Sequence, residues 1–183
     1  ASGQAVTVAH VVKPATDAAR LDPFELVRKS REKLERDVRD YRFTLLKQEL
    51  IAGELTPVQR VEVRYRHSPT SIYMIWKENA DQVKRALFVE HPDYVDASGQ
   101  KLARVEPAGS IVRMFVTDIF MPIKGERARK ASRRTIDECG LRPTLDLLDK
   151  SNALAKKNGV LDFRYEGTGE VAGRPTHVIV RYL

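Results

Sequence analysis

The chain has 183 residues, of which 42% are hydrophobic, 31% are charged and 7% are aromatic. This length and composition predict one globular domain, or one domain with a tail, and exclude an intrinsically disordered chain. No stretch approaches the roughly 20 consecutive apolar residues that a membrane-spanning helix needs. Lysine and arginine exceed the acidic residues by 32 to 25, and this excess favours an anionic partner without choosing among nucleic acid, lipid headgroups and acidic protein.

Residues 1–21 mix small residues with valine and have no sustained period, which predicts an extended arm before the domain. Ala1-Ser2-Gly3 would suit the mature end left by cleavage of a secretory signal, and an artificial chain boundary explains the same start equally well. We therefore expect an arm over residues 1–21 and a single domain over residues 22–183.

The first helix signal is Asp22-Pro23-Phe24-Glu25, which combines an N-cap acceptor, a proline at the first helical position and a glutamate three residues after the cap. Apolar residues then recur at helical spacing: Phe24, Val27, Leu34, Val38 and Tyr41. The pattern predicts an amphipathic helix with one buried face.

From about Tyr41 the apolar period changes to two, and turn-forming residues follow at short intervals. Val61, Val63 and Tyr65 alternate with charged residues, which is typical of a strand with one dry face. The gaps are too short for the crossovers that parallel strands need, so the sheet is predicted to be antiparallel. Residues 72–76 are apolar on both faces, which predicts a central strand covered on each side.

The C-terminal part begins with residues 111–123, the most apolar segment, whose period leaves strand and helix both open. A basic run over 127–134 follows without any acidic residue. Residues 141–157 predict a second helix that stops at Asn158-Gly159, and residues 161–182 predict a terminal hairpin. One α+β domain fits this order of elements.

The histidines and the cysteine do not form a recognisable catalytic or metal site. The four histidines are scattered, and none is spaced to share a metal with another, so no metal site is predicted. Cys139 follows two acidic residues that disfavour a thiolate, so we interpret it as a small buried hydrophobe. The chain has no nucleophile elbow and no phosphate loop, so neither an enzyme nor a cofactor is expected.

Two groups of residues suggest binding. The basic run could contact an anionic polymer or membrane, or could form a solvated loop; it contributes Arg127, Arg129, Lys130, Arg133 and Arg134. Nucleic acid is not expected, because the run has no aromatic residues to stack on bases. Met114, Phe115, Phe120 and Met121 could line a pocket with adaptable walls, and ordinary core packing explains the same residues.

Two stretches carry a family resemblance: residues 41–49 with Gly53-Glu54-Leu55, and residues 63–66 followed by 69–76. They are similar to a family of secreted bacterial proteins described only as a domain of unknown function, which resembles the LolA-like superfamily of outer-membrane lipoprotein carriers. The resemblance implies a strongly curved antiparallel sheet, or incomplete barrel, with the N-terminal helix and a helical insert packed in its concave face. It also implies an apolar cavity for acyl chains and export to the periplasm, and it brings no catalytic residue.

The leading hypothesis is a non-enzymatic periplasmic binding or carrier protein for a lipid or another hydrophobic ligand. The residues expected to line its cavity are Ile72, Met74, Trp76, Phe88, Phe115, Phe120 and Met121. Residues 111–123 are expected to act as a movable lid, and an anionic membrane or a membrane-bound protein is expected as a further partner. The alternative is a surface-binding module for anionic polymers or membranes that acts through the basic run.

Overall fold

The computed structural model describes residues 22–109, 118–171 and 173–182, so the predicted arm over residues 1–21 lies outside the described residues. The chain divides into two compact units. Of the described residues, one unit comprises residues 22–32 together with those from Leu145 onward, and the other comprises those between Lys33 and Thr144. Each unit is described by itself below.

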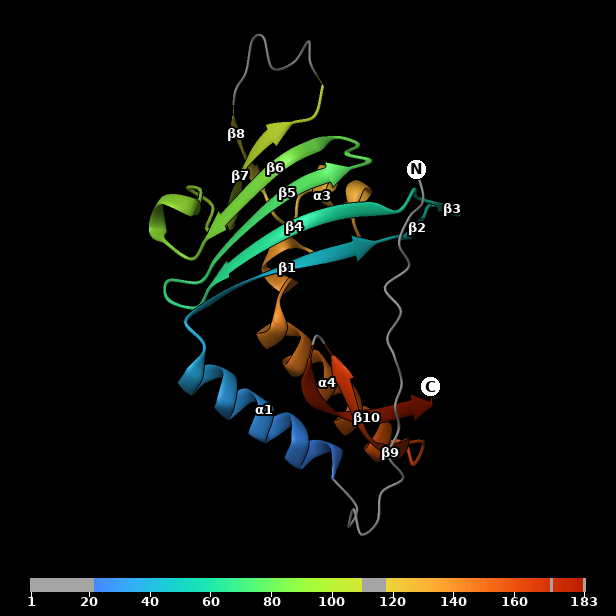
Figure 1. The fold of residues 1–183 in the computed structure, drawn as a ribbon. Helices are drawn as coiled ribbons and strands as arrows, with labels where there is room; N and C mark the ends of the chain where they lie inside the picture. Colours follow the sequence, from blue (N-terminus) through green and yellow to red (C-terminus); the bar gives the residue numbers. More distant parts are fainter. Residues whose placement is uncertain (1–21, 110–117, 172, 183) are drawn as a thin grey trace. The chain divides into compact units, whose positions relative to one another are not determined.

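The Lys33–Thr144 unit is built on a six-stranded sheet with the order β1-β4-β5-β6-β7-β8, in which every neighbouring pair is antiparallel (Figure 1). Its strands are β1 (Asp40–Lys47), β4 (Gln59–Arg66), β5 (Ser71–Glu78), β6 (Val83–Val89), β7 (Leu102–Pro107) and β8 (Ile119–Pro122). A small hairpin of β2 (Leu50–Ile51) and β3 (Glu54–Leu55) lies between β1 and β4 in the chain. The predicted antiparallel meander and the α+β class are confirmed.

The sheet is open, with β1 and β8 as its two edge strands. It is not strongly curled, so the predicted incomplete barrel is not confirmed (Figure 1). Alternation along a strand decides which face is dry, and it says nothing about how far the sheet bends.

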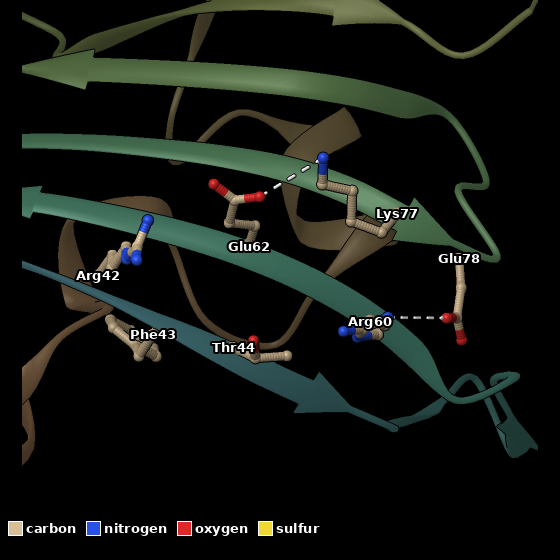
Figure 2. A pocket seen from close by; sticks show the side chains of 7 residues that line it. All are labelled: Arg42, Phe43, Thr44, Arg60, Glu62, Lys77 and Glu78. Carbon is tan, nitrogen blue, oxygen red and sulfur yellow. Dashed lines mark hydrogen bonds and ion pairs between the residues drawn. The ribbon is translucent and has the colours of Figure 1, made fainter. Parts of the chain in front are cut away.

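The two faces of the sheet differ as the alternation predicts. In β4, Val61 and Val63 are buried, whereas Arg60 and Glu62 lie on the opposite face (Figure 2). Strand β5 lies between β4 and β6, as expected for a central strand. The face of β5 that carries Tyr73 and Ile75, here called the outer face, is not covered as predicted. Its apolar side chains are only half-buried and lie beside charged residues of the neighbouring strands.

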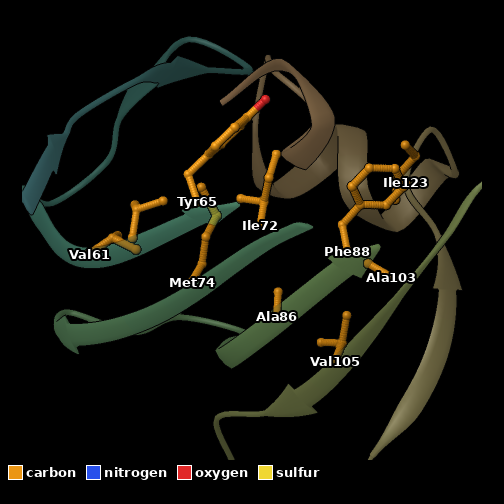
Figure 3. Close-up of a cluster of buried hydrophobic side chains, with 10 residues drawn as sticks. Val61, Tyr65, Ile72, Met74, Ala86, Phe88, Ala103, Val105 and Ile123 are labelled. Atoms are coloured by element: carbon orange, nitrogen blue, oxygen red, sulfur yellow. The ribbon is translucent and has the colours of Figure 1, made fainter. Parts of the chain in front are cut away.

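The hydrophobic core lies on the inner face of this sheet (Figure 3). Its buried residues are Val61, Val63, Tyr65, Ile72, Met74, Ala86, Phe88, Ala103, Val105 and Ile123. Residues 123–141, here called the cover segment, include the short helix α3 (Glu126–Ala131) and the 3-10 turn η2 (Ile136–Glu138). Ile123, Ile136 and Cys139 of this segment belong to or pack against the core.

The cover segment also corrects the predicted helical insert. Residues 110–117, which include much of the expected lid, lie outside the described residues. Within the described part, residues 119–122 form the edge strand β8, and the helical turns come after it. Pairing with β7 accounts for the strand, because four successive residues of β8 are in register with Leu102–Val105.

Helix α1 (Pro23–Asp37) begins where the sequence predicts, and the Phe24 N–H donates to Asp22 Oδ1 at 3.0 Å. Glu25 does not act as the expected capping-box partner. Its carboxylate instead pairs with Arg28 at 2.6 Å and with Lys29 at 3.3 Å. The N-cap hydrogen bond of Asp22 is therefore present, but the reciprocal bond from the Glu25 side chain is replaced by its ion pair with Arg28.

The other unit joins the first part of α1 to α4 (Leu141–Lys157) and to the hairpin of β9 (Asp162–Val171) and β10 (Arg174–Tyr182). Arg31 of α1 pairs with Asp146 of α4 at 3.0 Å. Arg181 of β10 donates to Ser151 Oγ of α4 at 2.7 Å. Both the second helix and the terminal hairpin are confirmed.

Candidate functional site

The inner face of the sheet brings together most of the residues predicted to line a cavity. Ile72 and Phe88 are 0% and 1% exposed, and Met74 is also buried. Trp76 and Met121 are partly buried and pack against the same cluster. Among the described residues this face is therefore a packed core, and a ligand entering it would have to displace existing contacts.

Phe120 does not share this face. Its side chain is 53% exposed and makes an edge contact with Tyr94, with ring centroids 5.5 Å apart. The alternation of β8 explains the correction, because it directs Ile119 and Met121 to the core and Phe120 to the other side. Phe115 lies outside the described residues.

The outer face carries a shallow hollow of about 580 Å³ that the sequence did not single out (Figure 2). Its lining residues come from β1, β4 and β5 and are Arg42, Phe43, Thr44, Arg60, Glu62, Lys77 and Glu78. Two ion pairs cross it, Lys77 with Glu62 at 3.4 Å and Arg60 with Glu78 at 3.3 Å. The sequence signal that could have located this hollow is the charged residues that alternate with Val61 and Val63 along β4 and therefore lie on the other face of the strand.

Charges in this hollow are largely compensated. Hydrogen bonding from Arg64 and Lys77 holds the pKa of Glu62 below its ordinary value, against a smaller opposing effect of burial, so the carboxylate stays ionised at neutral pH. Among the described residues, Arg42 has no acidic partner. The hollow can thus hold an anionic or polar group beside Arg42.

The predicted basic residues are all exposed. Arg127, Arg129 and Lys130 lie on α3, and Arg133 and Arg134 follow it. Lys130 pairs with Glu126 at 2.7 Å. Within the described chain the four arginines have no acidic partner, so the segment presents positive charge to its surroundings.

A partly buried carboxylate, that of Glu49, binds the backbone of this basic stretch. Glu49 Oε1 accepts a hydrogen bond from the Arg133 N–H at 3.1 Å and another from Ser132 Oγ at 3.4 Å. Lys47 pairs with Glu49 Oε2 at 2.9 Å and donates to the Ala131 carbonyl at 3.3 Å. The basic stretch is therefore hydrogen-bonded to Lys47 at the end of β1 and to Glu49 just after it, and part of it is the helix α3 instead of a loop, while its basic side chains are solvated.

The lowered pKa of Glu49 is consistent with these interactions. Burial alone would raise the pKa of the carboxyl, but Lys47 and the donors from the cover segment outweigh it and lower that pKa. Glu49 is thus charged at neutral pH and holds its partners through charge-assisted hydrogen bonds. Sequence reasoning missed Glu49 because 84 positions separate it from Arg133.

The far end of the cover segment meets two tyrosines. The Leu141 N–H donates to Tyr41 Oη at 2.7 Å, and the rings of Tyr41 and Tyr65 stack with centroids 4.9 Å apart. Nearby, Cys139 packs against the core and is partly buried, whereas the sequence predicted a buried residue. Burial raises the pKa of its thiol to about 11, so it is a poor nucleophile at neutral pH.

The described residues contain neither a helix long and apolar enough to cross a membrane nor a cluster of three or more potential metal ligands. No curated protein and no solved structure matches the chain. A family model described as "Protein of unknown function (DUF1571)" matches residues 38–182. No comparison supports the LolA-like part of the resemblance. Because the match runs from before β1 to the end of β10 and covers more than half of the sequence, the chain belongs to the DUF1571 family.

Proposed function

We propose that the protein is a non-enzymatic periplasmic binding protein that docks on an anionic surface through its basic residues 127–134. This proposal rests on the hydrogen bond from the Arg133 N–H to Glu49, whose carboxylate also pairs with Lys47, because these interactions hold the backbone that carries the exposed cations. A preordered array loses less conformational entropy on binding than a free loop does. The periplasmic location rests on the family resemblance alone.

The arginines supply the attraction. Of the five basic residues, Lys130 pairs with Glu126, whereas the four arginines have no acidic partner among the described residues. A cation close to an anionic membrane contributes about 1 kcal/mol, and salt screens this contribution over roughly 10 Å at 0.1 M. Several such charges on one short stretch predict binding that weakens steeply as salt rises.

The test compares two variants of equal net charge. In the first, Arg129, Arg133 and Arg134 are changed to serine. In the control, the exposed residues Lys33, Arg39 and Arg66 are changed to serine. Sedimentation with vesicles containing phosphatidylglycerol is measured over a salt series.

The first variant is expected to bind roughly 100-fold more weakly, because three lost charges at about 1 kcal/mol each correspond to about two powers of ten. The control is expected to stay within a few-fold of the wild type, since its charges lie elsewhere on the unit. Equal weakening of both variants would show that only total charge matters, and would overturn the proposed site.

A second candidate function, carriage of a hydrophobic ligand, draws support from the inner face of the sheet. Ile72, Met74 and Phe88 form a continuous apolar surface, and the partly buried Trp76 and Met121 pack against it. Carriage would require the sheet to curl into the incomplete barrel that the LolA-like resemblance implies. It would also require the cover segment, which packs against this face through Ile123, Ile136 and Cys139, to move away from the sheet.

A further inference from the structure

We propose that the β2–β3 hairpin is an apolar anchor that enters an anionic phospholipid bilayer, an inference that rests on the proposed surface docking. Leu50 and Leu55 are register partners in this hairpin. They are 57% and 64% exposed, so they form an apolar cross-strand pair in contact with solvent. Neighbouring Val58 is exposed as well. Exposed apolar clusters on small proteins commonly mark interaction sites.

The hairpin is held rigidly. Ala52 and Gly53 both have positive φ, 51° and 86°, as a tight two-residue hairpin turn requires. At its base the Thr56 N–H donates to the Glu49 carbonyl at 2.8 Å, and the Glu49 N–H donates to Thr56 Oγ1 at 2.9 Å. The leucine pair is therefore presented without a large ordering cost on binding.

Glu49 connects this hairpin to the basic stretch. Its backbone bonds to Thr56 at the base of the hairpin, while its side chain accepts from Ser132 and from the Arg133 N–H. One residue thus hydrogen-bonds both to the base of the hairpin and to the basic stretch, so the exposed leucine pair and the exposed cations lie on two segments joined at Glu49. Apolar residues flanked by arginines are typical of proteins that bind at a membrane interface.

Charge and polarity together select the bilayer as the partner. The arginines suit phosphate headgroups, and the leucines suit the acyl region just beneath them. Glu54 does not oppose this arrangement, because it pairs with Ile51 and its side chain therefore lies on the opposite face of the hairpin from Leu50 and Leu55. A soluble polyanion would satisfy the arginines but would leave the leucines in water.

The experiment measures binding of the full chain to vesicles of phosphatidylglycerol and phosphatidylcholine. The test variant is Leu50→Ser with Leu55→Ser, and the matched control is Val95→Ser. Val95 is 41% exposed and follows β6 at the end of the sheet opposite the hairpin. The double variant is expected to bind about 100-fold more weakly, roughly tenfold per leucine, with the salt dependence of the wild type. The control is expected to bind like the wild type.

A second measurement reports insertion without depending on loss of binding. A Leu55→Trp variant is mixed with vesicles whose acyl chains are brominated, and its fluorescence is compared with that of the wild-type chain, which contains only Trp76. Additional quenching in the variant is expected.

The two proposals fail separately. Unchanged binding of the double leucine variant, or no additional quenching of Leu55→Trp, would overturn the anchor and leave docking through the arginines intact. Binding to a soluble polyanion such as heparin without binding to vesicles would likewise overturn the anchor. Insensitivity of vesicle binding to the arginine substitutions would instead overturn the proposed function.

Discussion

Gly140 sits where a side chain has no room, and Gly140→Ala is expected to destabilise the Lys33–Thr144 unit. Its φ is +125°, and an added Cβ would lie 2.8 Å from Tyr41 Oη and 2.9 Å from two ring atoms of Tyr65. Neither ring can retreat freely, because the two rings stack and Tyr41 Oη accepts the Leu141 N–H. A disfavoured φ costs about 1–3 kcal/mol and overpacking a further 1–3 kcal/mol, so the expected loss is roughly 2–6 kcal/mol.

Urea unfolding followed by circular dichroism and by Trp76 fluorescence measures this loss. Gly99→Ala is the matched control, because Gly99 also has positive φ, +82°, but nothing lies within 4 Å of an added Cβ. Its expected cost is about 1–2 kcal/mol from backbone strain alone. If Gly140→Ala loses no more stability than Gly99→Ala, the steric argument about the tyrosines is refuted.

Two further predictions concern the thiol and the single tryptophan. With a pKa raised by burial to about 11, Cys139 should react with a thiol reagent at pH 8 far more slowly in the folded chain than in urea, and equal rates would contradict its burial. The pKa of Cys139 in the folded chain lies above the ordinary value of 9.0, so the protonated thiol contributes its full stability below pH 9, and this stability is lost as the pH rises toward 11. The Cys139→Ala variant should not show this fall in the free energy of unfolding between pH 9 and pH 11. If the inner face carries a hydrophobic ligand, added fatty acid or phospholipid should shift Trp76 emission and raise the melting temperature; no response to any amphiphile would count against carriage.

The sequence predicted most of the elements because their signals are local. The period-two alternation around Val61 and Val63 located a strand and its dry face, and the 141–157 helix was bounded by its own periodicity and by the stop at Asn158-Gly159. Curvature of the sheet was not predictable in this way. It depends on twist and on what packs against the faces, and alternation reports neither.

The candidate site was predicted only in part, for the same reason. The exposure of the five basic residues follows from their charge. The hydrogen bond that holds their backbone involves Glu49, which is distant in the sequence. Size and polarity alone do not separate Phe120 from Met121, whereas neighbours along a strand face opposite sides, so only the strand places Phe120 away from the core. The exposed leucines of the hairpin carried no sequence signal, since leucine is ordinarily read as core.

The meander has a consequence for the order in which the chain acquires its structure. From β4 to β8 each strand pairs with the strand that precedes or follows it in the sequence, so each pairing closes a short loop. The cover segment closes much longer ones, because 84 positions separate Arg133 from Glu49 and 100 separate Leu141 from Tyr41. Closing longer loops costs more entropy and slows folding, so we expect the sheet to assemble before its cover is in place. During that interval Ile72 and Phe88 would face water, and a newly made chain would be open to aggregation or to capture by a chaperone.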